Sequence, residues 1–469
     1  MVESVKKKKF KVPHTYVILF SVIIIMSILT YVIPAGEFDR VKEEATGRTL
    51  VSPDSFHNVE QNPIKPFALV QAVPRGMEDA AQIIFFIFIV GGAFQIITAT
   101  GTIEAGIGRL AKKLDGKENL MIPIFMVIFG IGGATFGMAE ETIVFVPIGI
   151  ALARALGFDA ITGTAMITLG AACGFNSGFM NPFSVGVAQG IAELPLFSGI
   201  IMRIIIFVVL LIITAIYIIR YAEKVKKDSS KSVVAELELE ERGKIIDLNN
   251  APTMRVHHNI ILLTVIAGFA VIITGVFKFD WYILEIGSTF LAIGVISGLI
   301  GGLGPSKIAQ EFVVGAKSIA FGALVVGVAR GILIVMKDGL IIDSIVYGLA
   351  KAIQILPKSI SVIGMYIVQV IINFFIPSGS GQAAATMPIM VPLSDLLGIT
   401  RQTAVMAFQF GDGFTNSIIP TSAALMGYLS MGNIPYEKWF KFIWPLMLIW
   451  IGTGMAFLVI ANGISYGPF

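Results

Sequence analysis

Charged residues are scarce in this sequence. Asp, Glu, Lys and Arg make up 14% of its 469 residues, whereas soluble globular chains carry about 25%. Hydrophobic residues make up 55%, and the mean hydropathy is +0.85. The apolar residues stand in near-continuous runs long enough to cross a bilayer as helix, not in the short alternating runs of barrel strands. The composition therefore predicts an all-α polytopic membrane protein and excludes a soluble globular one.

Cysteine and histidine are also rare. The single cysteine, Cys173, lies inside an apolar run, which excludes a disulfide framework and a thiolate metal cluster. The four histidines have no spacing typical of metal ligands. No nucleotide-binding motif of the form G-x-x-x-x-G-K-[ST] is present, which argues against ATP drive within this chain. The net charge of +3 is too small to indicate a nucleic-acid partner.

The N-terminal segment has two interpretations. A run of lysines at 6–9 and 11 precedes an apolar stretch at 15–34, as in a signal peptide or in an uncleaved first span. The apolar stretch is longer than a signal-peptide core of about 7–15 residues. We therefore interpret 1–34 as a basic segment followed by the first transmembrane helix. The lysines place the N-terminus in the cytoplasm.

Further spans and interruptions follow along the chain. Two long apolar regions, 120–157 and 358–397, contain Gly-rich breaks and are expected to form re-entrant hairpins. Two others, 160–192 and 402–431, are interrupted by "GFNSGFMNPFS" and "GFTNSIIPT" and are expected to be broken helices. The Lys and Arg clusters fit about nine crossings plus two hairpins in the inner (cytoplasmic) membrane, with the C-terminus extracytoplasmic. The remaining spans are expected at 81–99, 197–219, 259–277, 282–303, 318–336 and 440–461.

Segments of the first half recur in the second half, and the predicted topology gives the two copies opposite orientations in the membrane. "VPIGIALARALGFD" resembles "VPLSDLLGIT", "CGFNSGFMNPFS" resembles "DGFTNSIIPTS", and "TGTIEAGIGRLAKKL" resembles "DGLIIDSIVYGLAKAI", in the same order. This order predicts an inverted repeat, in which substrate and ion sites lie at broken helices near the midplane. The predicted segments are an extracytoplasmic loop at 35–65, repeat 1 at 66–221, a cytoplasmic linker at 222–257, two connecting helices at 258–303 and repeat 2 at 304–469.

Neutral oxygen donors gather at the two helix breaks. Their hydroxyls and amides, with freed backbone carbonyls, can coordinate a small cation such as Na+. Alternatively they only cap the backbone groups that the breaks expose. We expect no cofactor and no metal other than a possible Na+. The candidate cation ligands are Asn176, Ser177, Asn181, Ser184, Asp412, Thr415, Asn416, Ser417, Thr421 and Ser422. Asp412, the one carboxylate among them, is either a cation ligand or only a charge at a helix end.

Three charged residues in apolar surroundings are candidate substrate ligands. Arg330 lies deep in a span, where an Arg costs at least about 2.5–3.5 kcal/mol on insertion scales. It is either an anchor for a substrate carboxylate or one half of a structural ion pair. Glu140 and Glu141, at the first hairpin tip, either receive a cation, a proton or a substrate ammonium, or are solvated or paired with Arg330. The other candidate substrate ligands are Asn176, Ser378, Ser380, Gln382 and Asn416.

Asp159 and Arg154 fall at a predicted membrane edge. They are expected to be solvated or to reach toward water from the bilayer surface rather than to serve the site.

Several segments together resemble the C4-dicarboxylate anaerobic carrier (DcuC) family, in particular its YfcC-like branch. They are "KKFKVPHTYVILF", "TYVIPAGEFDR", "VGVARGILIVM", "IPSGSGQAAATMPIMVPLSDLLG" and "QFGDGFTNSIIPTSA". The resemblance places the chain in the ion-transporter superfamily, beside the p-aminobenzoyl-glutamate (AbgT) and divalent anion:sodium symporters. It implies two inverted repeats, two hairpins, a homodimer and transport of dicarboxylates or basic amino acids such as arginine and ornithine. The divalent-anion relatives carry Ser-Asn-Thr at both hairpin tips, whereas the tips here read "GMAEET" and "SGSGQA".

The expected function is secondary active transport of a small carboxylate-bearing metabolite by alternating access. Coupling to Na+, coupling to H+ and exchange remain open at this point. A channel or non-transporting receptor is the alternative. A membrane-embedded enzyme using Glu140 and Glu141 as a carboxylate pair is a weaker one, since no metal-spaced His accompanies them.

Overall fold

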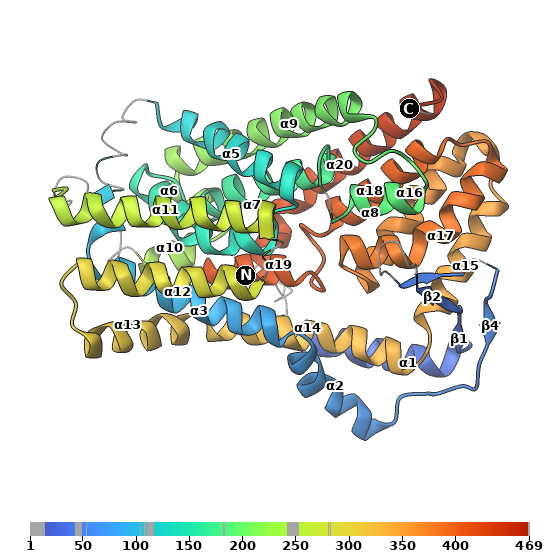
Figure 1. Ribbon diagram of the computed structural model, residues 1–469, viewed down its shortest axis with the longest axis horizontal. Coiled ribbons are helices and arrows are strands. Elements are labelled where there is room, and N and C mark those ends of the chain that lie inside the picture. Colours follow the sequence, from blue (N-terminus) through green and yellow to red (C-terminus); the bar gives the residue numbers. More distant parts are fainter. Residues whose placement is uncertain are drawn as a thin grey trace, which may run out of the picture.

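The fold is almost entirely helical. The computed structural model describes residues 15–42, 49–52, 54–103, 105–106, 109, 117–181, 183–241, 253–279, 281 and 283–467, and long helices lie side by side through most of it (Figure 1). The first half contains α1 (Thr15–Val32), α2 (Pro66–Asp79), α3 (Ala81–Ala99), η1 (Glu118–Leu120), α5 (Met121–Phe136), η2 (Glu140–Phe145), α6 (Val146–Ala155), α7 (Ala160–Ser177), α8 (Val185–Ile191) and α9 (Ile200–Lys227). The second half contains η3 (Ser229–Lys231), α10 (Ala235–Glu241), α11 (Val256–Phe279), α12 (Ile283–Ile300), α13 (Pro305–Ser318), α14 (Ala320–Asp338), α15 (Ile342–Gln354), α16 (Lys358–Phe375), α17 (Gly379–Leu397), α18 (Arg401–Thr415), α19 (Ala423–Met431) and α20 (Tyr436–Gly463).

Four short strands follow α1 and form two small antiparallel pairs. β1 (Gly36–Glu37) pairs with β4 (His57–Asn58), and β2 (Arg40–Lys42) pairs with β3 (Thr49–Val51). This strand segment lies beside α15 at one end of the molecule (Figure 1). It is therefore placed beyond the ends of the long helices.

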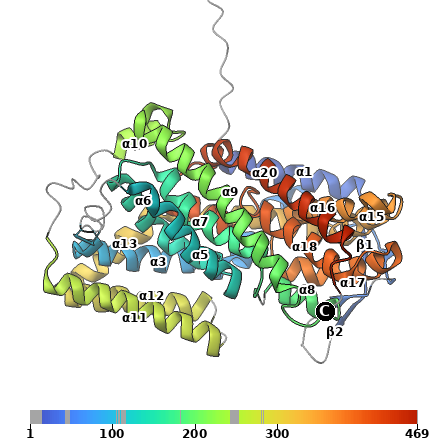
Figure 2. The same cartoon turned by 90° about the horizontal axis from the view of Figure 1, so that it is seen from above.

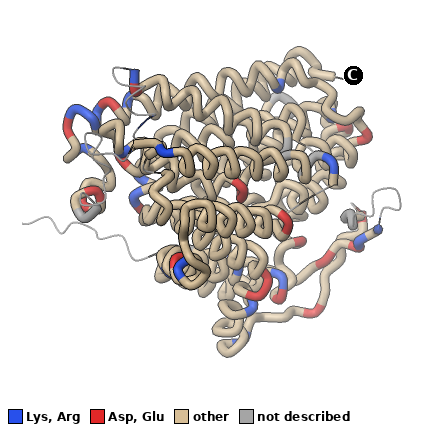
Figure 3. Tube along the Cα trace, turned by 60° about the vertical axis from the view of Figure 1, so that its left-hand side comes forward, with Lys and Arg blue, Asp and Glu red and all other residues tan. Residues whose placement is uncertain are grey.

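The outer helices carry apolar side chains on their exposed faces. Ile201 of α9 is 74% exposed and Leu263 of α11 is 65% exposed. Charged residues gather near the helix ends and leave the middles largely free of charge (Figure 3), and α11 and α12 lie together at one edge (Figure 2). An apolar exterior of this extent is suited to lipid rather than to water.

The number of membrane crossings is only partly settled by helix length. Within the described ranges, five helices are long and apolar enough to span a bilayer, and the bent pair formed by α13 and α14 makes a sixth. The apolar parts of α1, α11 and α16 are shorter. The count of nine crossings stays a prediction.

Both polar segments at 174–184 and 413–421 interrupt helices. Helix α7 ends at Ser177, because Gly178 takes a left-handed conformation with φ of 54°, and helix resumes only at Val185 in α8. Helix α18 ends at Thr415, and α19 begins after Ser422, whose side chain accepts a hydrogen bond from the Leu425 amide. The chain also leaves helical geometry at Gly137, where φ is 66°, and at Ile376.

The two interrupted helices form the centre of the molecule. Nearly every described residue of α7 and α18 is buried. Glycines let α5 and α7 approach backbone to backbone, since a Cβ added at Gly174 would lie 1.8 Å from the Gly130 carbonyl oxygen. Small residues at such crossings are typical of membrane helix pairs, which gain stability from close packing.

Part of the linker folds onto the beginning of α7. Asp159 is 1% exposed and accepts hydrogen bonds from the Thr162 amide at 2.9 Å and from the Tyr221 and Ser232 hydroxyls at 2.6 Å. Arg154 pairs with Glu238 of α10 at 2.9 Å. The expectation that Asp159 is solvated is therefore wrong, because residues from α9 and the linker surround it.

Replacing Asp159 with alanine should destabilise the protein strongly. The substitution removes the N-cap of α7 and leaves the Tyr221 and Ser232 hydroxyls without their shared acceptor. Since hydrogen bonds to a charged group contribute about 1.5–3 kcal/mol each, we expect a loss of at least about 3 kcal/mol. Thermal unfolding of the purified protein in detergent measures the effect. Asp395→Ala is the control, because that side chain is 46% exposed and pairs with Arg401 at the surface; equal shifts for both variants would contradict the prediction.

Candidate functional site

A central cavity of about 620 Å³ lies where the two helix breaks meet the tips of the two predicted hairpins. Its wall brings together segments that are distant in the sequence. Of the predicted substrate ligands, Arg330, Glu140, Glu141, Asn176, Ser378, Ser380 and Asn416 line it. Gln382 does not line it: its amide nitrogen donates instead to Gln369 Oε1 at 2.7 Å, between α16 and α17. Most of the predicted set therefore shares one space.

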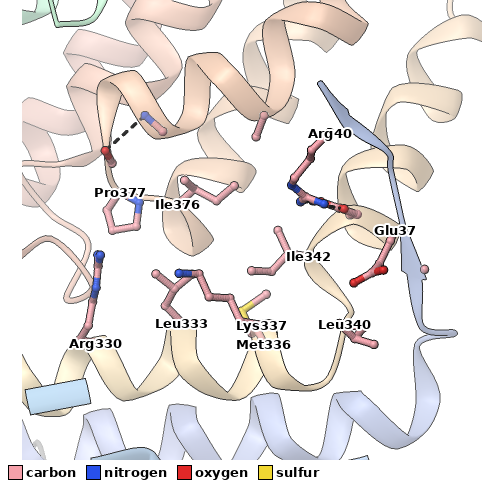
Figure 4. A pocket seen from close by; sticks show the side chains of 15 residues that line it. Glu37, Arg40, Arg330, Leu333, Met336, Lys337, Leu340, Ile342, Ile376 and Pro377 are labelled. Atoms are coloured by element: carbon pink, nitrogen blue, oxygen red, sulfur yellow. Dashed lines mark hydrogen bonds and ion pairs between the residues drawn. The ribbon is translucent and has the colours of Figure 1, made fainter. Parts of the chain in front are cut away.

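Arg330 lines the central cavity, and its side chain extends from α14 toward Pro377 (Figure 4). Its Nε donates to the carboxylate of Asp79 at the end of α2, and the two side chains are 34% and 31% exposed. Among the described residues, the two Nη groups have no hydrogen-bond partner. Arg330 is thus oriented by Asp79, not by Glu140 or Glu141, and its Nη groups are not used in that ion pair.

Glu140 and Glu141 form an acidic wall of the same cavity. They begin η2, and Glu141 Oε2 accepts a hydrogen bond from the Ala139 amide at 3.0 Å. The Ala139 carbonyl accepts hydrogen bonds from the hydroxyls of Thr142 at 2.7 Å and Tyr428 at 2.8 Å. Tyr428 therefore holds this tip against α19. In the described structure these two adjacent carboxylates form no ion pair, although Arg330 is near enough to Glu140 for charge attraction, and they are suited to a positively charged ligand.

A second group of polar atoms is buried at the wall of the cavity and beside it. Asp412 Oδ2, Ser184 Oγ and both amide atoms of Asn176 are buried and have no hydrogen-bond partner among the residues that the structure describes. They lie close together: a Cβ added at Gly379 would be 3.2 Å from Asp412 Oδ2 and 3.1 Å from Ser184 Cβ. A Cβ at Gly413 would be 2.4 Å from Asn176 Oδ1. The glycines thus permit α7, α17 and α18 to meet at these atoms.

Buried polar atoms without partners are costly, at about 1–3 kcal/mol each, and few occur in folded proteins. Several of them gather around Asp412. One carboxylate with neutral oxygens is a donor set that suits Na+, and the carboxylate alone could instead take a proton. Within the ranges that the structure covers, no group of three or more His, Cys, Asp or Glu side chains is placed to hold a metal ion.

Other predicted cation ligands bond to nearby backbone groups. Ser177 Oγ donates to the Gly174 carbonyl at 2.8 Å, and Asn181 Oδ1 accepts from the Phe183 amide at 2.9 Å. Ser422 caps α19. These contacts agree with the alternative in which the side chains satisfy a helix break.

The remaining predicted ligands of the second break differ in the hydrogen bonds that they form. Thr415 Oγ1 donates to the Gly411 carbonyl at 2.9 Å. Ser417 lines the central cavity, and its carbonyl accepts the Trp439 indole hydrogen bond at 2.9 Å. Thr421 Oγ1 is buried without a partner. Ser417 and Thr421 thus keep hydroxyls that are not committed to the break.

Asn373, which ties α16 to the second break, is not among the residues predicted from the sequence. Its amide nitrogen contacts the Asp412 carbonyl at 2.8 Å, Thr415 Oγ1 at 2.7 Å and Asn416 Oδ1 at 3.0 Å. A signal was present, because Gln369 and Asn373 are amides four residues apart in an otherwise apolar helix and so share one face. Asp79, the partner of Arg330, had no comparable signal in the sequence.

The family model described as C4-dicarboxylate anaerobic carrier matches residues 12–463. The chain belongs to this family. The carrier is 37% identical over 476 residues, 94% of each chain, to an Escherichia coli (strain K12) protein named "Putative basic amino acid antiporter YfcC". It is 29% identical over 500 residues to an uncharacterized Haemophilus influenzae protein, covering 97% of this chain and 98% of that one. The carrier is therefore a membrane transport protein by family.

One solved structure also overlaps with the carrier. The YdaH transporter of Alcanivorax borkumensis is 14% identical to it, with a TM-score of 0.41, and the overlap covers 97% of this chain and 100% of that one.

Proposed function

We propose that the carrier is a secondary active transporter of an amino acid with a positively charged side chain, such as arginine or ornithine. The observation that carries this proposal is the charge of the central cavity. Arg330 lines one part of it, and the adjacent pair Glu140 and Glu141 lines another. A ligand with a carboxylate at one end and an ammonium or guanidinium at the other complements both.

The carboxylate end would meet Arg330 and the beginning of α17. Ser378 caps this helix by accepting the Gly381 amide hydrogen bond, and Ser378, Gly379 and Ser380 line the cavity. The free amides at a helix N-terminus carry partial positive charge and favour an anion. Arg330 adds a guanidinium, which is suited to bidentate binding of a carboxylate.

The cationic end would meet Glu140 and Glu141. A C4-dicarboxylate in the same pose would place its second carboxylate against these two acids, which is repulsive. The charge of the cavity therefore favours the basic amino acid over the dicarboxylate. The name of the Escherichia coli relative agrees with this choice.

Alternating access by an inverted repeat is part of the proposal, and element lengths support it. Helices α2 and α13 each have 14 residues and begin with Pro, and α3 and α14 each have 19 residues. Packing is reciprocal, since α2 contacts α14 and α13 contacts α3 (Figure 1). The proposal retains about nine crossings, a cytoplasmic N-terminus in the inner membrane and a homodimer, as the family resemblance implies.

We further propose that the atoms around Asp412 hold the coupling cation, either Na+ or a proton. Asp412 lies directly behind the α17 N-terminus, because Gly379 approaches both its carboxylate and the central cavity. A cation there would strengthen carboxylate binding at the tip through charge attraction. Occupation of the two sites would thereby be linked.

Uptake by the purified carrier in proteoliposomes tests this function. We expect counterflow of labelled arginine or ornithine, stimulated by a Na+ gradient, by a pH gradient or by the same amino acid inside. Changing both Glu140→Gln and Glu141→Gln should reduce arginine uptake at least about 100-fold, because two charged contacts worth about 1.5–3 kcal/mol each are lost. The doubly changed carrier should also gain relative preference for neutral amino acids or succinate.

The matched control changes Glu60 and Glu193 to Gln. Both are glutamates that do not line the cavity, and uptake should be nearly unchanged. Succinate transport with no uptake of any basic amino acid by the unchanged carrier would reject the proposed substrate. Absence of uptake of every compound under all three driving conditions would reject the transport proposal.

A further inference from the structure

A second cavity of about 510 Å³ adjoins the central one and is named here the strand-side cavity. It lies between the strand segment, α14, α15 and the beginning of α17. Arg330, Pro377 and Ser378 line both cavities. A ligand leaving the strand-side cavity would therefore reach Arg330 first on its way to the central one.

The strand-side cavity has one acid and one base that are not used in ion pairs. Arg40 Nη2 donates to both carboxylate oxygens of Asp343, at 3.0 Å and 2.9 Å, so these two charges offset each other. Glu37 and Lys337 also line the cavity, and neither forms an ion pair with any residue that the structure describes. Glu37 and Lys337 are thus the carboxylate and the ammonium outside ion pairs, and the Lys337 ammonium also attracts the Asp79 carboxylate from a distance.

These two side chains come from different walls. Glu37 projects from β1 and Lys337 from α14, with the hydrophobic side chain of Ile342 between them (Figure 4). Lys337 extends along α14 toward Arg330, whereas Glu37 lies at the opposite, strand end (Figure 4). The order of charges along the cavity is therefore positive near Arg330 and negative at the strands, with an apolar middle.

Hydrogen bonds hold the strand segment that carries Glu37. The Gly36 amide donates to the Leu340 carbonyl at 3.0 Å, and the Phe38 amide donates to Asp343 Oδ2 at 3.0 Å. Phe56 stacks on Tyr347 of α15 with ring centroids 4.0 Å apart. Since the residues on both sides of Glu37 are bonded to the helices, its position is set by the fold.

We propose that the strand-side cavity is a second binding site for a basic amino acid, in which Glu37 binds the side-chain cation and Lys337 binds the α-carboxylate. The ligand class rests on the proposed function, but the two binding residues, Glu37 and Lys337, do not line the central cavity. The carboxylate end lies toward Arg330, so the substrate would enter the central cavity with that end leading. The apolar middle accommodates the methylene groups of the side chain.

Equilibrium binding of labelled arginine to the purified full-length carrier tests this site. We expect two arginine molecules per chain. Changing both Glu37→Gln and Lys337→Gln should leave one, and Arg330→Ala should leave only the weaker, strand-side one. The control changes Glu60→Gln and Lys317→Gln, which remove one acid and one base that line neither cavity, and it should retain two.

The outcomes separate the two proposals. A single bound arginine that is lost with Arg330→Ala and is unaffected by the Glu37 and Lys337 changes would overturn the strand-side site and leave the proposed function standing. Absence of arginine binding in the unchanged carrier would overturn both. In proteoliposomes, arginine is supplied on the side to which the strand-side cavity opens. The variant with both Glu37 and Lys337 changed should then have a KM for arginine about tenfold higher than that of the unchanged carrier, and a maximal rate within about twofold of it.

Discussion

Arginine binding to the central cavity should be lost when Arg330 is replaced by alanine. The change removes two Nη groups that have no other partner in the described structure and that lie at the cavity shared by the two tips. A bidentate bond to a carboxylate contributes about 2–3 kcal/mol. We therefore expect the Kd for arginine at this site to rise about 30- to 150-fold, as measured by equilibrium binding or by ligand-induced thermal stabilisation.

Two companion variants distinguish a substrate ligand from a structural ion pair. Arg330→Lys keeps the charge near Asp79 but loses the planar two-pronged donor, so it should fold normally and still bind arginine weakly. Asp79→Asn removes the partner that orients Arg330 and should weaken binding by a smaller factor, about fivefold. If Arg330→Ala and Asp79→Asn lower stability equally and neither changes arginine binding, Arg330 serves only the ion pair with Asp79.

Cation dependence should disappear when Asp412 is replaced by asparagine. The substitution preserves the size of the side chain in a site that is 0% exposed, so the packing of α18 is retained. It removes the only carboxylate among the unpartnered atoms around Gly379. We expect arginine uptake driven by a Na+ or pH gradient to fall about 100-fold, while arginine binding at high concentration persists.

Ser184→Ala supplies a graded comparison for Asp412→Asn. Loss of one neutral oxygen should weaken a Na+ site about tenfold, whereas it should scarcely affect protonation of Asp412. Measuring uptake with Na+ replaced by choline, at fixed pH, separates the two cations in both variants. Gradient-driven uptake that survives Asp412→Asn would exclude this residue as the cation ligand.

The places where helices break could be predicted from single residues. Gly178 and Ser422 illustrate why: glycine takes a left-handed conformation that other residues resist, and a serine before a helix caps its first free amides. The apolar runs likewise predicted α3 at 81–99, since lipid-facing and buried helix share one composition. These are local effects, so neighbouring residues carry the information.

Side-chain partners could not be predicted in the same way. Asp159 stands at the start of a helix like any capping residue, yet Tyr221 and Ser232 approach it from α9 and the linker and bury it. An arginine in an apolar helix is expected to pair with an acid, and the sequence suggested Glu140 or Glu141. The observed partner is Asp79 of α2. Each pairing depends on where a distant helix crosses.

The sequence by itself determined the membrane class, the helical runs and the two polar interruptions, because hydropathy, glycine conformation and helix capping act over a few residues. Only the tertiary structure decided that Ser184 and Asp412 meet at Gly379, that Asn176 packs against the neighbouring Gly413, and that Arg330 and the Glu140–Glu141 pair face one cavity. The physical reason is that close helix crossings bring these groups together. At such a crossing a glycine in one helix leaves room for the polar atoms of another.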